Sequence, residues 1–247
     1  MKKAFWPLLF VFSASAAALR FWEVRHHFDP LTGLVVPAAV PLWLLPVLLV
    51  LAAACFFLMA RRAAYKTPED GVPFSFSGSA AAAAMTAGSF LLAFSAVLSF
   101  RASGMRLLSV LLLLFALASA AAYFACVLLL RRGKRFGGGL LLIPACFAAV
   151  ELVMLYRTRY GSDPVLAGFY PEVLALALLC ITALAFSAFW FESGKPRLFL
   201  PAAAMSVVLS FCCAFELRSG AALFSYLSAG LLSVGMLAAF FSASSKK

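Results

Sequence analysis

The feature that most constrains the fold is a series of long apolar segments that follow one another along the whole chain. A helix that crosses the hydrocarbon core of a bilayer needs about 20 mostly apolar residues. Short polar stretches separate the segments that come close to this length, which are residues 4–19, 38–60, 80–100, 107–130, 140–156, 171–191, 198–215 and 221–241. The sequence therefore predicts an all-α integral membrane protein with eight transmembrane helices.

Composition argues against a soluble fold of this length. Of the 247 residues, 65% are hydrophobic and 12% are charged, whereas a soluble domain has about 50% apolar and about 25% charged residues. So much apolar surface needs lipid as its solvent. The longest polar stretch, residues 61–79, has no hydrophobic pattern of its own. We therefore expect residues 1–247 to form a single transmembrane domain.

The distribution of basic residues predicts the orientation. Cytoplasmic loops of membrane proteins carry an excess of lysine and arginine. With the N-terminus inside, 13 of the 20 basic residues lie on the inner side, and the 7 on the outer side are all arginines. This interpretation places both termini in the cytoplasm and explains the net charge of +11 without a nucleic-acid partner. We expect the protein in the plasma (cytoplasmic) membrane of a bacterial cell, in contact with membrane lipids.

The N-terminal segment has two interpretations. Two lysines, an apolar run and the triplet Ala-Ser-Ala at 14–16 form the pattern of a cleavable signal peptide, and cleavage would leave seven helices. Alternatively, the segment is a helix that extends to residue 24, so that Arg20 snorkels and Trp22 lies at the interface. An internal repeat favours the second interpretation, because it gives the first helix a counterpart in the second half.

The repeat rests on one specific pattern, R-x-x-x-D-P-x6-P. It begins at Arg25 and again at Arg159, at a constant offset of 134 residues, and each copy follows a predicted helix. Four helices in each half give both halves the same orientation, an arrangement known from transporters. The sequence thus predicts two parallel four-helix repeats, 1–130 and 140–247, joined by a basic cytoplasmic loop, 131–139.

The arginine and aspartate of each copy are candidate site residues. Arg25 and Asp29, like Arg159 and Asp163, are four positions apart, so on a helix they share one face and can pair. An Asp-Pro step is equally typical of a turn that starts a helix. The pattern therefore predicts either a rigid turn that orders the loop or an outward-facing Arg/Asp site in each half.

The outer basic residues, among them Arg101 and Arg218, are arginines without exception. A guanidinium group offers a planar fork that fits carboxylates and phosphates, whereas a lysine offers a point charge. Two interpretations remain open. The arginines form structural ion pairs and contacts with lipid headgroups, or they form an outer vestibule for a small anionic ligand.

Glu151 is the strongest single candidate, because it lies inside the predicted helix 140–156. Its neighbours one turn away are apolar, so nothing on its own helix can pair with it. A carboxyl group there needs a partner on another helix or a water-filled cavity, and such residues are often functional. The sequence predicts a role in ion or proton coupling, or else a hydrogen bond that locks the packing.

No motif indicates catalysis, a metal or a cofactor. All six cysteines lie in apolar segments without metal-ligand spacing, and the chain lacks HExxH, GxSxG and P-loop patterns. We therefore expect a carrier or receptor-like binder of a small anionic or amphipathic molecule. The alternative is a non-catalytic membrane subunit or scaffold that holds a partner membrane protein.

Overall fold

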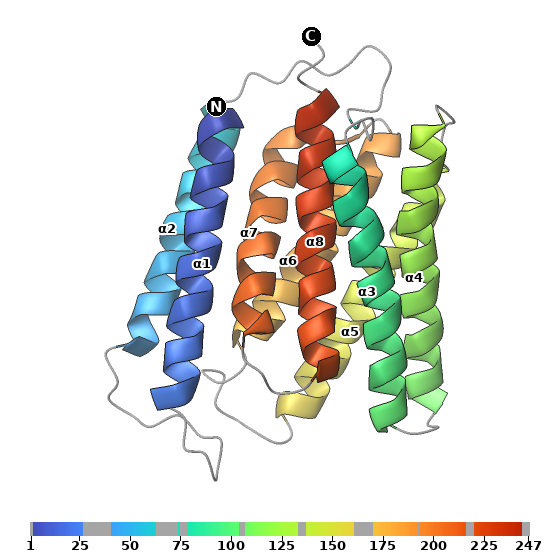
Figure 1. The fold of residues 1–247 in the computed structure, drawn as a ribbon, viewed down its shortest axis with the longest axis horizontal. Coiled ribbons are helices and arrows are strands. Elements are labelled where there is room, and N and C mark those ends of the chain that lie inside the picture. The colour runs from blue at the N-terminus through green and yellow to red at the C-terminus, as the bar shows by residue number, and fades with distance from the viewer. Residues whose placement is uncertain are drawn as a thin grey trace.

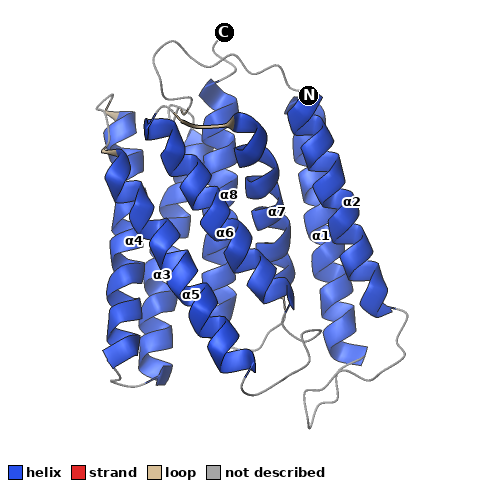
Figure 2. Cartoon of the chain, turned by 180° about the vertical axis from the view of Figure 1, so that it is seen from behind, coloured by secondary structure: helices blue, strands red, loops and turns tan. Residues whose placement is uncertain are grey.

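The computed structural model is a bundle of long helices that run side by side (Figure 1). It describes residues 2–26, 41–62, 74, 79–103, 107–132, 137–160, 170–191, 193–215 and 220–243. The long helices are α1 (Lys2–His26), α2 (Pro41–Arg62), α3 (Ser79–Ser103), α4 (Leu107–Arg131), α5 (Leu142–Tyr160), α6 (Tyr170–Ala188), α7 (Pro196–Ala214) and α8 (Gly220–Ala243). Two short 3-10 helices, η1 (Gly138–Leu141) and η3 (Phe189–Phe191), precede α5 and follow α6. The described part of the chain contains no strand (Figure 2).

All eight long helices of the described chain are long and apolar enough to cross a membrane. This confirms the prediction of an all-helical, multi-pass membrane protein. The helix ends lie within a few residues of the predicted ones, except that α1 continues to His26, as its longer interpretation predicted. The start of α1 and the end of α8 lie at the same end of the bundle (Figure 1).

Helix α7 connects the hairpin of α1 and α2 with the other helices. It packs against α1, α2, α6 and α8, whereas α1 and α2 have extensive contacts only with each other and with α7 among the described residues. Every residue from 202 to 210 is buried. At the end of the bundle where α1 begins, Phe5 of α1 contacts Phe56 of α2 and Phe241 of α8, with ring centroids 5.5 and 4.9 Å apart. The hairpin of α1 and α2 is therefore attached to the remaining helices mainly through α7.

Small residues bring α3 and α8 close together, and this is the most extensive helix contact in the protein. A Cβ atom built on Gly235 would lie 2.9 Å from the backbone nitrogen of Met85 and 3.2 Å from the backbone oxygen of Ala81. On Gly88 it would lie 2.8 Å from Cγ of Leu232. The alanine-rich start of α3, which includes Ala81, takes part in this close packing, as small residues do between membrane helices.

The helix contacts do not follow the symmetry that the predicted repeat implies. A two-fold axis relating α1–α4 to α5–α8 would match the α3–α8 contact with one between α7 and α4. It would likewise match the α6–α7 contact with one between α2 and α3. Neither counterpart is an extensive contact among the described residues. The loops that carry the R-x-x-x-D-P pattern lie largely outside the described residues, and the repeat stays a prediction from sequence.

An aromatic cluster closes one end of the bundle between α6, α7 and α8. Its centre is Phe74, from the connection between α2 and α3, which is buried. The ring of Phe74 stacks on Trp190, with ring centroids 5.5 Å apart and an interplanar angle of 6°. The other rings around Phe74 are those of Phe186, Phe189, Phe199 and Phe240. Through this cluster, Phe74 of the α2–α3 connection packs against the ends of three helices.

Candidate functional site

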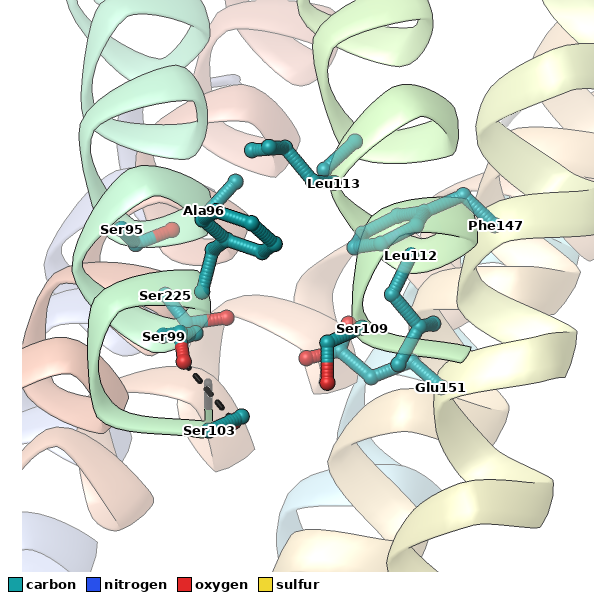
Figure 3. A pocket seen from close by; sticks show the side chains of 12 residues that line it. Ser95, Ala96, Ser99, Ser103, Ser109, Leu112, Leu113, Phe147, Glu151 and Ser225 are labelled. Carbon is teal, nitrogen blue, oxygen red and sulfur yellow. Dashed lines mark hydrogen bonds between the residues drawn. The ribbon is translucent and has the colours of Figure 1, made fainter. Parts of the chain in front are cut away.

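A cavity of about 100 Å³ lies between α3, α4, α5 and α8. It lies at the end of the bundle away from the aromatic cluster, since it involves the last turns of α3 and the first turns of α4 and α8. Its polar lining consists of one carboxyl group and five hydroxyl groups, those of Glu151, Ser95, Ser99, Ser103, Ser109 and Ser225. Figure 3 shows the serines of α3 on one side of the cavity and Glu151 on the other.

Glu151 projects from the membrane-spanning part of α5 toward α8. There the hydroxyl group of Ser225 lies near its carboxyl group, and both line the cavity. Phe147, one turn earlier on α5, lines the same cavity and supplies an apolar wall. The structure thus provides both surroundings expected for such a carboxyl group, a partner on another helix and an adjoining cavity.

The serine hydroxyl groups of α3 are oriented by their own helix. Ser95 donates to the carbonyl oxygen of Leu92 at 2.9 Å, and Ser103 donates to that of Ser99 at 2.8 Å. A hydroxyl group has one hydrogen and two lone pairs. Because the hydrogen is used within the helix, each of these side chains retains acceptor capacity for other partners.

A second, smaller void of about 20 Å³ adjoins the first at Glu151. Glu151 and Ser225 line both spaces, and Ser119 and Tyr123 of α4 and Ser228 of α8 line the smaller one. Its volume suffices for one water molecule, which needs at least about 10–15 Å³. Glu151 therefore stands between a cavity near the helix ends and a polar space deeper in the bundle.

The predicted arginines do not join Glu151 in the cavity. Arg25 is exposed on α1, with its guanidinium carbon 4.4 Å from the centroid of the Phe21 ring. Arg101 is exposed on α3 and does not line the cavity. Arg159 belongs to the last turn of α5, but its side chain lies outside the described residues.

Asp29, Asp163 and Arg218 also lie outside the described residues. Of the candidates predicted from sequence, Glu151 is thus the one placed in a cavity. The serines of α3 were not predicted, although their spacing carries a signal. Ser95, Ser99 and Ser103 follow at intervals of four residues, which places them on one face of a helix.

A second polar cluster lies near the C-terminal end of α1. Arg20 and Glu23 form an ion pair at 2.8 Å, and their side chains are 0% and 2% exposed. The prediction that Arg20 snorkels to the interface is therefore wrong, because the guanidinium group finds its counter-ion one turn away and is covered by protein. Tyr170 of α6 lies near enough to interact electrostatically with both. Glu172, in the first turn of α6, is buried as well.

Within the described residues, no three His, Cys, Asp or Glu side chains are grouped so that they could hold a metal ion. Comparison with models of known protein families, with curated proteins and with solved structures found no match. The class of protein is therefore set by the fold, and it is that of multi-pass helical membrane proteins.

Proposed function

We propose that this protein is a carrier or receptor-like membrane protein that binds a small amphipathic molecule in the cavity around Glu151. The observation that carries the proposal is a carboxyl group on a membrane-spanning helix that adjoins a cavity, with no counter-ion among the described residues of the lining. A carboxyl group within a membrane is energetically expensive. If Glu151 served packing alone, adjoining space would bring no benefit, whereas a binding site requires such space.

The proposal includes a plasma-membrane location with both termini in the cytoplasm, as the distribution of basic residues predicts. In that orientation the cavity lies in the outer half of the bundle, and the aromatic cluster around Phe74 lies at the cytoplasmic end. A ligand would then reach Glu151 from outside the cell. Ser99 and Ser103, which are exposed, lie at the entrance on this side.

The sequence-based expectation of an anionic ligand loses support at this cavity. None of the described arginines lines it, so an anion would meet a carboxyl group without a compensating positive charge. The amphipathic character of the expected ligand gains support, because Phe100, Leu112 and Phe147 line the cavity beside the hydroxyl groups.

Native mass spectrometry of the full chain, extracted gently from its own membrane, tests the proposal. We expect a small molecule bound in 1:1 stoichiometry, and its loss in the Glu151→Gln variant. A suitable control is Val153→Ala, since Val153 is 64% exposed on the same helix and does not line the cavity. An empty parent protein that folds normally would contradict the proposal.

The alternative function, a subunit that holds a partner membrane protein, is favoured by a groove of about 560 Å³ between α1 and α7. Its floor includes Ala14 and Ala18, two small residues four positions apart on the exposed face of α1. Small residues at this spacing let a second helix approach closely. In the same experiment, a co-purifying polypeptide together with an empty cavity would favour this alternative.

A further inference from the structure

We infer that the ligand presents a small organic cation of the alkylammonium class to Glu151. This inference rests on the proposed function, because it names the chemical class of ligand for the same cavity. It does not depend on the anionic ligand that the outer arginines led us to expect from the sequence. Three features of the lining carry it: its charge, the direction of its hydrogen bonds and its apolar wall.

Charge is the first feature. Among the described residues, the carboxyl group of Glu151 is the one ionisable group in the lining, and no lysine, arginine or histidine accompanies it there. Away from water, a negative charge without a counter-ion is costly, and pairing with a cation offsets much of that cost. A cationic ligand provides the missing counter-ion, whereas an anion would add a second negative charge.

The direction of the hydrogen bonds is the second feature. The hydroxyl hydrogens of Ser95 and Ser103 are used on carbonyl groups of α3. These groups therefore present oxygen lone pairs to the cavity. An ammonium group has donors and no acceptor, so it complements this lining, whereas a carboxylate or phosphate ligand requires donors.

The apolar wall distinguishes an organic cation from a metal ion. Phe100 and Phe147 line the cavity, and aromatic ring faces attract ammonium groups. Hard metal ions instead need a shell of about six or more oxygen ligands, and the described residues contain no cluster of metal-binding side chains. The volume of about 100 Å³ is several times the roughly 10–15 Å³ that one water molecule needs, so it has room for an ammonium group with a few carbons. A longer chain can extend past Ser99 and Ser103.

Three organic probes of similar size and one metal ion test the inference on the full chain in lipid nanodiscs. They are propylammonium, propionate, propanol and sodium ion, each titrated by calorimetry. We expect propylammonium to bind and propionate not to bind. The Glu151→Gln variant should weaken propylammonium binding at least tenfold, while Val153→Ala leaves it unchanged. If the Gln variant fails to fold, Ser103→Ala at the cavity entrance serves instead, with an expected two- to fivefold loss.

The outcomes separate this inference from the proposed function. If propionate or propanol binds in a Glu151-dependent manner and propylammonium does not, the inference of a cationic ligand is wrong, but the proposed binding function stands. If sodium ion alone binds in a Glu151-dependent manner, the inference that the ligand is an organic cation is wrong. If no probe binds, the molecule found by mass spectrometry decides: an amine supports the inference, and any other class refutes it. An empty cavity in both experiments overturns the inference and the function together.

Discussion

Two glutamates of the membrane-spanning helices differ in what surrounds them. Glu23 has Arg20 one turn away on its own helix, and both side chains are covered by protein. Glu151 has the hydroxyl group of Ser225 and an open cavity. A carboxylate that is neutralised within its helix can serve the structure, whereas one beside empty space is available to a ligand. The surroundings, rather than the residue type, assign the two roles.

The buried pair makes a prediction about stability. Removing one member of a buried ion pair leaves the other charge uncompensated and costs about 3–5 kcal/mol. We expect Arg20→Met to lower the free energy of unfolding by this amount, and the double variant with Glu23→Gln to regain part of it. Denaturant unfolding in detergent micelles measures the change. The control is Arg25→Met, an exposed residue of the same helix, which should change stability by about 0.5 kcal/mol or less.

If Arg20→Met and Arg25→Met unfold alike, the pair at the end of α1 contributes nothing to stability. A double variant less stable than Arg20→Met alone would show that Glu23 has another essential partner.

The sequence identified only part of the candidate site. Glu151 could be predicted because a carboxyl group inside an apolar segment needs an explanation in any fold. Ser225 could not, because serine is common in helices and its importance comes from its position opposite α5. That position depends on which helices are neighbours, which a single sequence does not specify. The contact between Arg20 and Glu23 was accessible from their spacing of three residues.

At the scale of helices, the α3–α8 contact depends on the absence of side chains. Gly88 of α3 and Gly235 of α8 leave room for Leu232 and Met85 of the opposite helix. Within a membrane, helices associate through close packing, since lipid tails are as apolar as leucine. The cavity depends on this contact, because α3 and α8 contribute Ser95 and Ser225 to its lining.

A single methyl group should therefore disturb this contact. In Gly235→Ala, the new Cβ atom would clash with Cγ of Met85 and lie 2.9 Å from its backbone nitrogen. Overpacking of this kind costs about 1–3 kcal/mol, and we expect a lower melting temperature in detergent. The matched control is Gly220→Ala at the start of the same helix, where nothing lies within 4 Å. Equal melting temperatures of the two variants would contradict the structure at this contact.

The sequence predicted the helices well and their neighbours poorly. Length and hydropathy are properties of one segment, so the eight spans were predicted within a few residues of their ends. Neighbours depend on side chains that meet across segments. The loops that carry the motif beginning at Arg25 and Arg159 lie largely outside the described residues, so the repeat stays a prediction. Glycines such as Gly235, which lets α3 approach α8, show that single positions influence which helices are neighbours.

The orientation of the whole molecule can be tested at two exposed positions. Ala102 lies near the end of α3, and Ser193 lies in the connection between α6 and α7, at the opposite end of the bundle. With a membrane-impermeant maleimide added to intact cells, we expect labelling of Ala102→Cys. Labelling of Ser193→Cys should require permeabilised cells. The parent chain measures the background from its own six cysteines. The reverse labelling pattern would show that the protein has the opposite orientation, with the cavity on the cytoplasmic side.

The position of α7 in the bundle has a consequence for how the protein is made. The helices α1 and α2 leave the ribosome first, but α7 is their main neighbour. At about 5–20 residues per second, the 133 residues between Arg62 and Pro196 take roughly 7–27 seconds to synthesise. During this time, the early hairpin must remain in the bilayer without its final neighbour. Arg20 and Glu23 already neutralise each other within α1, so that helix can enter the membrane before the rest of the chain exists.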